Sequence, residues 1–100
     1  MMNKNIDVQK LKNGETIKIK PKGNSMLPLI KSGQICTISP IKESKDLKIN
    51  DIVYCKVKSN LYLHKISGIK KNQFQISNNK GFVNGWITAN NIFGILIEVK

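Results

Sequence analysis

The stretch NLYLHKISGIKKNQFQIS, residues 60–77, indicates the fold class of the chain most clearly. In an extended strand, its first part places Tyr62, His64 and Ile66 on one face and Leu61, Leu63 and Lys65 on the other. A Lys-Lys-Asn turn separates this run from QFQIS, which again alternates strand-forming side chains. The sequence therefore predicts two strands joined by a short turn.

Similar short runs recur along the chain, and no segment shows a sustained helical period with caps. Strands are predicted in ETIKIKPKG (15–23), QICTISPI (34–41), DIVYCKVK (51–58) and NIFGILIEVK (91–100). Asp51 is expected to support the turn before the third of these strands, and SMLPLI (25–30) is either one helical turn or an extended loop. About six short strands in such a chain predict an all-β fold, a small, partly open β-barrel or coiled sheet. We expect a single domain over residues 13–100, with a tail or short extension at 1–12.

The chain is strongly basic, with a formal net charge of +11 at pH 7. All 17 basic residues are lysines, and the chain has no arginine, the side chain that reads guanine or clamps a phosphate with two parallel hydrogen bonds. Positive charge speeds encounters with polyanions but gives little specificity by itself. We therefore do not expect a dedicated nucleic-acid partner, although a basic, nucleic-acid-binding β-domain stays open as an alternative.

The two cysteines, Cys36 and Cys55, lie in apolar, alternating runs without CxxC spacing. Because a structural zinc site needs four soft ligands at short spacing, we expect no metal or other cofactor, and buried free thiols rather than a disulfide. Residues 1–15 lack the apolar run of a signal peptide, and no stretch reaches the roughly 20 apolar residues of a membrane helix. The expected location is the cytoplasm, and a peripheral contact of SMLPLI and the lysines with anionic lipid stays open.

Candidate chemistry lies in KGNSMLPLIKSG (22–33) and in the only histidine, His64. Histidine is the most frequent general base for a hydroxyl nucleophile, and small residues before Ser25 let backbone N–H groups approach a developing oxyanion. Each residue alone also fits a structural role, as a turn serine or a strand histidine. Together they indicate a Ser–His pair, and strand alternation directs Lys65 away from the face that carries His64.

Four segments in order resemble the successive sequence boxes of signal peptidase and LexA-type serine peptidases: KGNSMLPLIKSGQICTISPI, LKINDIVYCKV, LYLHKISGI and NIFGILIEV. In that group a Ser-Met-x-Pro box holds the nucleophile, and a later box with His or Lys before a basic residue holds the general base. The resemblance runs from Ile17 to Val99 and implies the β-fold of the LexA and signal peptidase type.

The resemblance implies that Ser25 is the nucleophile and His64 the general base, with Gly23 and Asn24 in the turn that supports the serine and the oxyanion. Histidine-type members of the group orient the imidazole with an aspartate after the base strand, where this chain reads QISNNKGFVNGW without an acid. We expect Asn78 or Asn79 to take that place, because an amide oxygen also accepts a hydrogen bond from the ring.

The resemblance further implies a serine endopeptidase that binds a peptide or protein substrate in extended form, with small residues before the cut. The only alanine, Ala89, precedes Asn90, and the chain has no Ala-Gly or Cys-Gly pair for self-cleavage, so we expect cleavage in trans. The alternative within the same family is a catalytically inactive member that acts as a binding or regulatory module.

Overall fold

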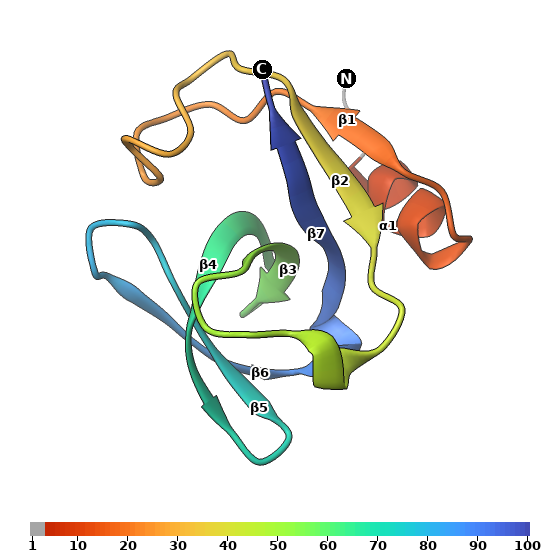
Figure 1. Cartoon of the computed structure of the whole chain (residues 1–100), viewed down its shortest axis with the longest axis vertical. Coiled ribbons are helices and arrows are strands. Elements are labelled where there is room, and N and C mark those ends of the chain that lie inside the picture. Colours follow the sequence, from red (N-terminus) through yellow and green to blue (C-terminus); the bar gives the residue numbers. More distant parts are fainter. Residues whose placement is uncertain (1–3) are drawn as a thin grey trace.

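The computed structural model describes residues 4–100, with side chains from residue 6 onward. Its elements are α1 (Lys4–Lys12), β1 (Ile17–Ile19), β2 (Cys36–Pro40), η1 (Ser44–Asp46), β3 (Ile52–Val57), β4 (Asn60–Lys70), β5 (Gln73–Ser77), β6 (Val83–Thr88), η2 (Ala89–Asn91) and β7 (Ile92–Val99). The strands form one antiparallel sheet in the order β1-β2-β7-β3-β4-β5-β6. The predicted all-β class is confirmed, as a coiled sheet that is not closed into a barrel (Figure 1).

Strand β3 is buried on both faces because its side chains alternate between two hydrophobic clusters. Val53, Cys55 and Val57 belong to the first cluster, which lies inside the curl of β3, β4, β5 and β6. Tyr54 points the other way, into the second cluster. Strand β3 thus contributes side chains to both hydrophobic clusters, and the remaining strands pack around it.

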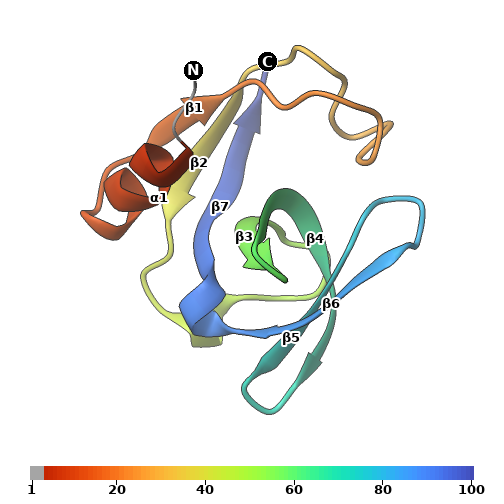
Figure 2. The same cartoon turned by 180° about the vertical axis from the view of Figure 1, so that it is seen from behind.

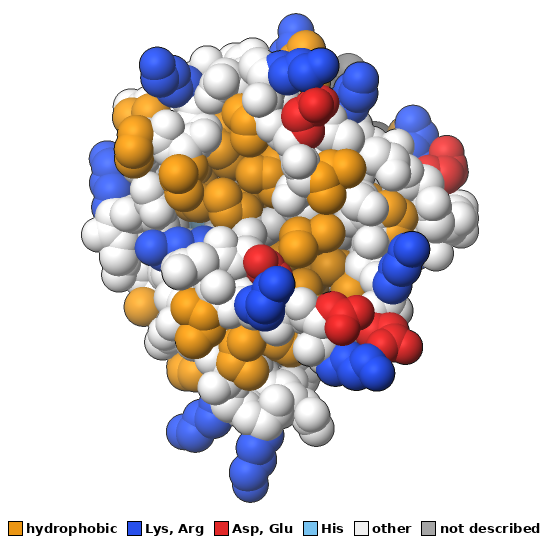
Figure 3. All heavy atoms as spheres, viewed as in Figure 1, with side chains coloured by type: hydrophobic (Ala, Val, Ile, Leu, Met, Phe, Trp, Pro, Cys, Tyr) orange, Lys and Arg blue, Asp and Glu red, His pale blue; other side chains and the backbone are white. Residues whose placement is uncertain are grey.

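The second cluster packs the N-terminal helix and the loop before β2 against the sheet. Leu11 of α1 and Met26 and Ile30 of the loop are buried there with Ile38 of β2. Figure 2 shows α1 lying across β1 and β2. Figure 3 shows hydrophobic side chains gathered in the hollow between the loop and β7, with lysines around the margin of this face. The members of the second cluster are themselves buried, and the side chains packed at its margin, such as Leu61, Leu96 and Val99, are half-buried.

Helix α1 and strand β6 were not expected from the sequence. Helix α1 occupies most of the segment taken as a tail or short extension, whose residues 1–3 lie outside the described part. It inserts Leu11 into the second cluster, with Val8 packed at its edge, which is too small an apolar face to give a clear helical period. In β6, Gly85 interrupts the run of strand formers, as glycine does at strand irregularities. Within residues 4–100, no helix has the length and apolar character needed to cross a bilayer.

Two smaller predictions are confirmed. Asp51 supports the turn before β3, since its Oδ2 accepts a hydrogen bond from Lys48 N–H at 2.9 Å. Cys36 and Cys55 are buried free thiols, one in each cluster. Burial raises the pKa of the Cys55 thiol to about 12, so this side chain stays protonated and acts as an apolar core residue.

A substitution at Gly94 of β7 tests how tightly the second cluster is packed. A Cβ at this position would lie 2.5 Å from Ile38 Cγ2, 2.9 Å from the Ser39 carbonyl oxygen and 3.1 Å from Leu11 Cδ2. The backbone oxygen cannot move without disturbing the pairing of β2 with β7. We predict that Gly94→Ala lowers the free energy of unfolding by about 1–3 kcal/mol, measured by urea denaturation.

Gly68→Ala is the matched control. A Cβ there would meet Trp86 Cη2 at 3.2 Å and Gln75 Cβ and Oε1 at 3.3 Å, contacts that need shifts of only a few tenths of an ångström, and the Trp86 ring is 43% exposed and can move toward solvent. The expected loss is below about 1 kcal/mol. Equal losses for the two variants would contradict the close packing of α1 and β2 over Gly94.

Candidate active site

The loop between β1 and β2 presents Ser25 on a compact turn. Gly23 has φ +100°, a left-handed conformation that favours glycine. Met26 and Ile30 are buried on either side of the turn, and Ile30 N–H donates to the Met26 carbonyl at 3.0 Å. SMLPLI therefore forms hydrogen-bonded turns with a cis Leu27-Pro28 peptide bond, which is neither the helical turn nor the extended loop that we expected, and Ser25 is left half-buried at their start.

His64 is fixed in the middle of the sheet by its own strand. It lies on β4 opposite Val53 of β3, and its side chain is 6% exposed. Tyr62, two residues earlier on the same face, stacks on the imidazole with ring centroids 4.7 Å apart. The predicted alternation along β4 is confirmed, and the ring is shielded from water and held in its plane.

The structure brings Ser25 and His64 together. Nε2 of His64 lies 3.2 Å from Ser25 Oγ, and Nδ1 lies 2.7 Å from Asn84 Oδ1. Because an amide oxygen only accepts, Nδ1 carries the ring proton and donates it to Asn84. Nε2 then presents a lone pair to the Ser25 hydroxyl, which is the tautomer that a general base needs.

Asn84 reaches the ring through a β-bulge. Ile76 of β5 pairs with Gly85 and Ser77 pairs with Val83, so Asn84 is the extra residue on β6. A bulge of this kind redirects a side chain and occurs often beside functional sites. Gly85 follows with φ +153°, a conformation that glycine adopts readily. The signal in the sequence was therefore the Asn-Gly pair within QISNNKGFVNGW, where a glycine interrupts a strand.

The prediction that Asn78 or Asn79 orients the imidazole needs correction, since the ring's partner is Asn84. Asn78 instead shapes the β5–β6 turn, where its Oδ1 accepts from the N–H groups of Lys80 and Phe82, both at 2.9 Å. A side chain already bonded twice to its own turn is not free to reach His64.

Asn79 supports the serine rather than the histidine. Its backbone N–H donates to the Ser25 carbonyl at 2.8 Å, and its Nδ2 donates to the Leu27 carbonyl at 2.8 Å. Lys65 Nζ donates to Asn79 Oδ1 at 3.5 Å, so Lys65 contacts the residue that holds the serine turn and not Ser25 itself. Figure 1 shows the β1–β2 loop and the β5–β6 turn facing each other at one side of the molecule.

The electrostatics of the site favour neutral imidazole. Burial lowers the pKa of His64 below its ordinary value of 6.5, and the hydrogen bond to Asn84 opposes part of that shift. The hydrogen-bonded set of Ser25, His64 and Asn84 contains no carboxylate. At neutral pH the ring is therefore ready to accept a proton.

The turn before the serine also leaves donors unused. The Asn24 carbonyl accepts from Leu27 N–H at 3.3 Å, whereas the N–H groups of Gly23, Asn24 and Ser25 donate no hydrogen bond to residues 4–100.

In the described part of the chain, no three His, Cys, Asp or Glu side chains gather as a metal ion would require. No protein-family model matches the chain, and a search of curated proteins finds no match.

The single histidine makes the ring directly measurable by NMR. We predict that His64 titrates with a midpoint below 6.5 and that its neutral form carries the proton on Nδ1. Asn84→Ala should lower the midpoint further, because it removes the hydrogen bond that raises the pKa, and should weaken the tautomer preference.

The control is Asn79→Ala, which removes the side-chain bond to the Leu27 carbonyl but keeps the backbone bond to the Ser25 carbonyl and the contact of Asn84 with the ring. Its histidine titration should match that of the unmodified protein. A midpoint at or above 6.5 in the unmodified protein would contradict the buried, neutral ring.

Proposed function

We propose that the protein is a serine endopeptidase of the signal peptidase and LexA type, which cleaves a peptide bond in trans. The observation that carries the proposal is the His64 ring bridging Ser25 Oγ and Asn84 Oδ1 at hydrogen-bond distances. Nucleophile, base and orienting group are the three parts of a serine hydrolase site. The order of the sequence boxes around Ser25 and His64 supports the same family.

In the proposed reaction, His64 Nε2 takes the Ser25 hydroxyl proton as Oγ attacks the carbonyl carbon of the substrate. The unused N–H groups of Ser25 and of Gly23 or Asn24 hold the oxyanion. His64 then gives its proton to the leaving amine, and an acyl-enzyme forms on Ser25. Water, activated by His64, hydrolyses that ester and regenerates the hydroxyl.

Asn84 sets the rate that this site can reach. Its oxygen fixes the tautomer and the ring orientation, but an amide cannot stabilise the imidazolium by charge as an aspartate does. Replacing the carboxylate of a known serine peptidase triad by an amide lowers turnover by about 10⁴-fold, largely because the wrong tautomer results. Asn84 presents its oxygen to Nδ1, which selects the tautomer that a general base needs. This site therefore avoids the loss of turnover that the wrong tautomer causes.

The substrate binds extended, with small side chains before the cut, as the family resemblance implies. Met26, the residue after Ser25, is buried in the second cluster, whereas Leu29 of the same turn is 53% exposed, so the serine turn presents an apolar side chain to solvent. Cleavage in trans agrees with the position of Ala89, which starts the short turn η2 between β6 and β7 and offers no extended segment.

A fluorophosphonate probe tests the nucleophile. We predict that the protein is labelled on Ser25 and that both Ser25→Ala and His64→Ala abolish labelling, because attack requires the hydroxyl and the base. Ser32→Ala is the matched control, since Ser32 is an exposed serine of the same loop, and it should be labelled normally. Intact-mass measurement gives the stoichiometry.

Two results would contradict the peptidase. Labelling that persists in Ser25→Ala places the reactive group elsewhere. A folded protein that is not labelled over a wide pH range favours the inactive binding module.

The pH dependence of labelling tests the base. The rate should follow the neutral fraction of His64, so it rises with pH and reaches half its plateau below pH 6.5. Asn84→Asp should raise the pKa of His64, because a carboxylate favours the charged ring, and the labelling rate should then begin to fall at a higher pH. The same change should raise the plateau about tenfold or more, since a carboxylate stabilises the imidazolium. An unchanged pH dependence and plateau in Asn84→Asp would argue against His64 as the base.

A further inference from the structure

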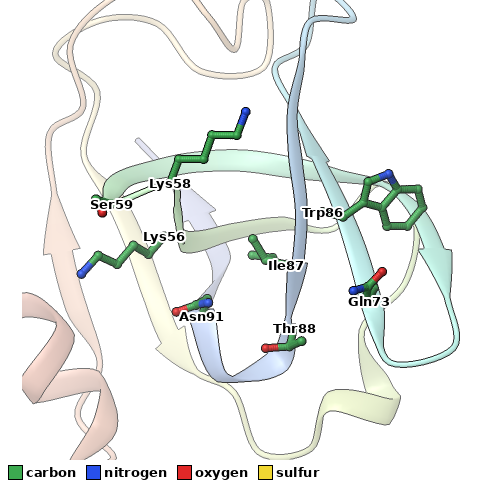
Figure 4. Close-up of a pocket in the computed structure, with 8 residues that line it drawn as sticks. All are labelled: Lys56, Lys58, Ser59, Gln73, Trp86, Ile87, Thr88 and Asn91. Atoms are coloured by element: carbon green, nitrogen blue, oxygen red, sulfur yellow. The ribbon is translucent and has the colours of Figure 1, made fainter.

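An open pocket of about 480 Å³ lies between the β3–β4 hairpin and strand β6. Figure 4 shows Lys56, Lys58 and Ser59 of the hairpin on one side and Thr88 and Trp86 of β6 on the other. None of these residues contributes to the hydrogen bonds of Ser25 and His64. The pocket is a second, separate feature of the surface.

The pocket carries uncompensated positive charge. Its lining includes Lys56 and Lys58 and no aspartate or glutamate. In the described part of the chain, the ion pairs are Lys45 with Glu43 and Lys100 with Glu98, so neither pocket lysine has a carboxylate partner. Hydroxyl and amide side chains supply further donors. The fitting ligand is therefore anionic.

The pocket also runs along an exposed strand edge. Strand β6 is at one end of the sheet order and pairs with β5, which leaves its other edge without a strand partner among residues 4–100. Its sequence VNGWIT contains no charged residue of the kind that protects an edge from pairing. β1, at the opposite end, is three residues long and carries Lys18 at its centre. An extended peptide can thus add to β6 through main-chain hydrogen bonds, which a nucleic acid cannot make.

The same strand connects the pocket to the catalytic pair. Asn84 on β6 bonds to His64, and Thr88 in the pocket lies four residues further on, about 13 Å along a strand. Lys58 Cε lies 4.0 Å from the position that a Cβ on Gly85 would take, so the lysine reaches the residue after Asn84. A peptide running beside the site along β6 would meet Lys58 and then Lys56.

We propose that the substrate carries an acidic segment on one side of the scissile bond, which adds to the free edge of β6 and binds Lys56 and Lys58. The cleavage part rests on the proposed function, whereas the binding part does not. Because Trp86 is the only tryptophan and lines the pocket, its fluorescence reports occupancy without a label.

The test uses full-length Ser25→Ala, which cannot cleave the ligand, and titrates it with a peptide of alternating glutamate and valine while Trp86 fluorescence is recorded. The same peptide with glutamine in place of glutamate is the neutral comparison. We expect the acidic peptide to bind about tenfold more tightly, and the advantage to shrink as salt is added, as for two solvent-exposed charge contacts.

Lys56→Gln together with Lys58→Gln should remove that advantage. The matched control, Lys18→Gln together with Lys20→Gln, changes the net charge equally near the opposite edge of the sheet and should keep it. N-methylation of alternate peptide bonds should abolish binding in one register and spare the other, because only one set faces β6.

Three results would overturn the acidic-peptide site: equal binding of the acidic and neutral peptides, equal loss in the two lysine pairs, or tighter pocket binding of an oligonucleotide of the same charge. Peptide binding without fluorophosphonate labelling would leave the site in place and refute the peptidase. Labelling without peptide binding would support the peptidase and refute the acidic-peptide site.

Discussion

The coiling of a single sheet is the constraint on which the candidate site depends. Ser25 comes from the loop between β1 and β2, at one end of the strand order, and Asn84 comes from β6 at the other. In a flat sheet β2 and β6 would lie about 24 Å apart, at about 4.8 Å per strand. Register shifts in the pairs β2–β7, β3–β7, β4–β5 and β5–β6 increase the local twist. The two ends therefore converge on His64, and local errors in coiling would separate Ser25 and Asn84 from His64 before they unfolded the protein.

The β5–β6 hairpin links the two ends, because it touches both partners of the histidine. At its tip Asn79 bonds to the carbonyls of Ser25 and Leu27, and within β6 Asn84 bonds to the ring. The distance from Oγ to Nε2 is thus set by one short hairpin and not by two independent loops. A peptide added along β6 would rest on the same hairpin, so substrate binding and dyad geometry share one structural element.

Sequence patterns predicted the parts of this structure that depend on local periodicity. Strand-forming residues indicated β3, alternation in β4 indicated the strand and the face of His64, and the turn before Ser25 combined with a downstream histidine indicated the pair. Asn84 was missed because its role depends on a bulge, which shifts the register by one residue and is set by pairing with β5. Helix α1 was missed because Leu11 supplies most of its burial, so tertiary packing and not periodicity stabilises it.

The amide at position 84 fits a histidine whose neutral form is favoured by burial. Burial already disfavours the charged ring, and an aspartate in place of Asn84 would be a partly buried negative charge that lacks a partner while the imidazole is neutral. An amide oxygen is a dipole, which orients the ring at little desolvation cost but stabilises the imidazolium weakly. Ser25, His64 and Asn84 thereby form a hydrogen-bonded chain without a buried ion pair. In the proposed reaction the cost falls on the step in which His64 is protonated, so we expect the missing carboxylate to lower the rate and not the stability of the fold.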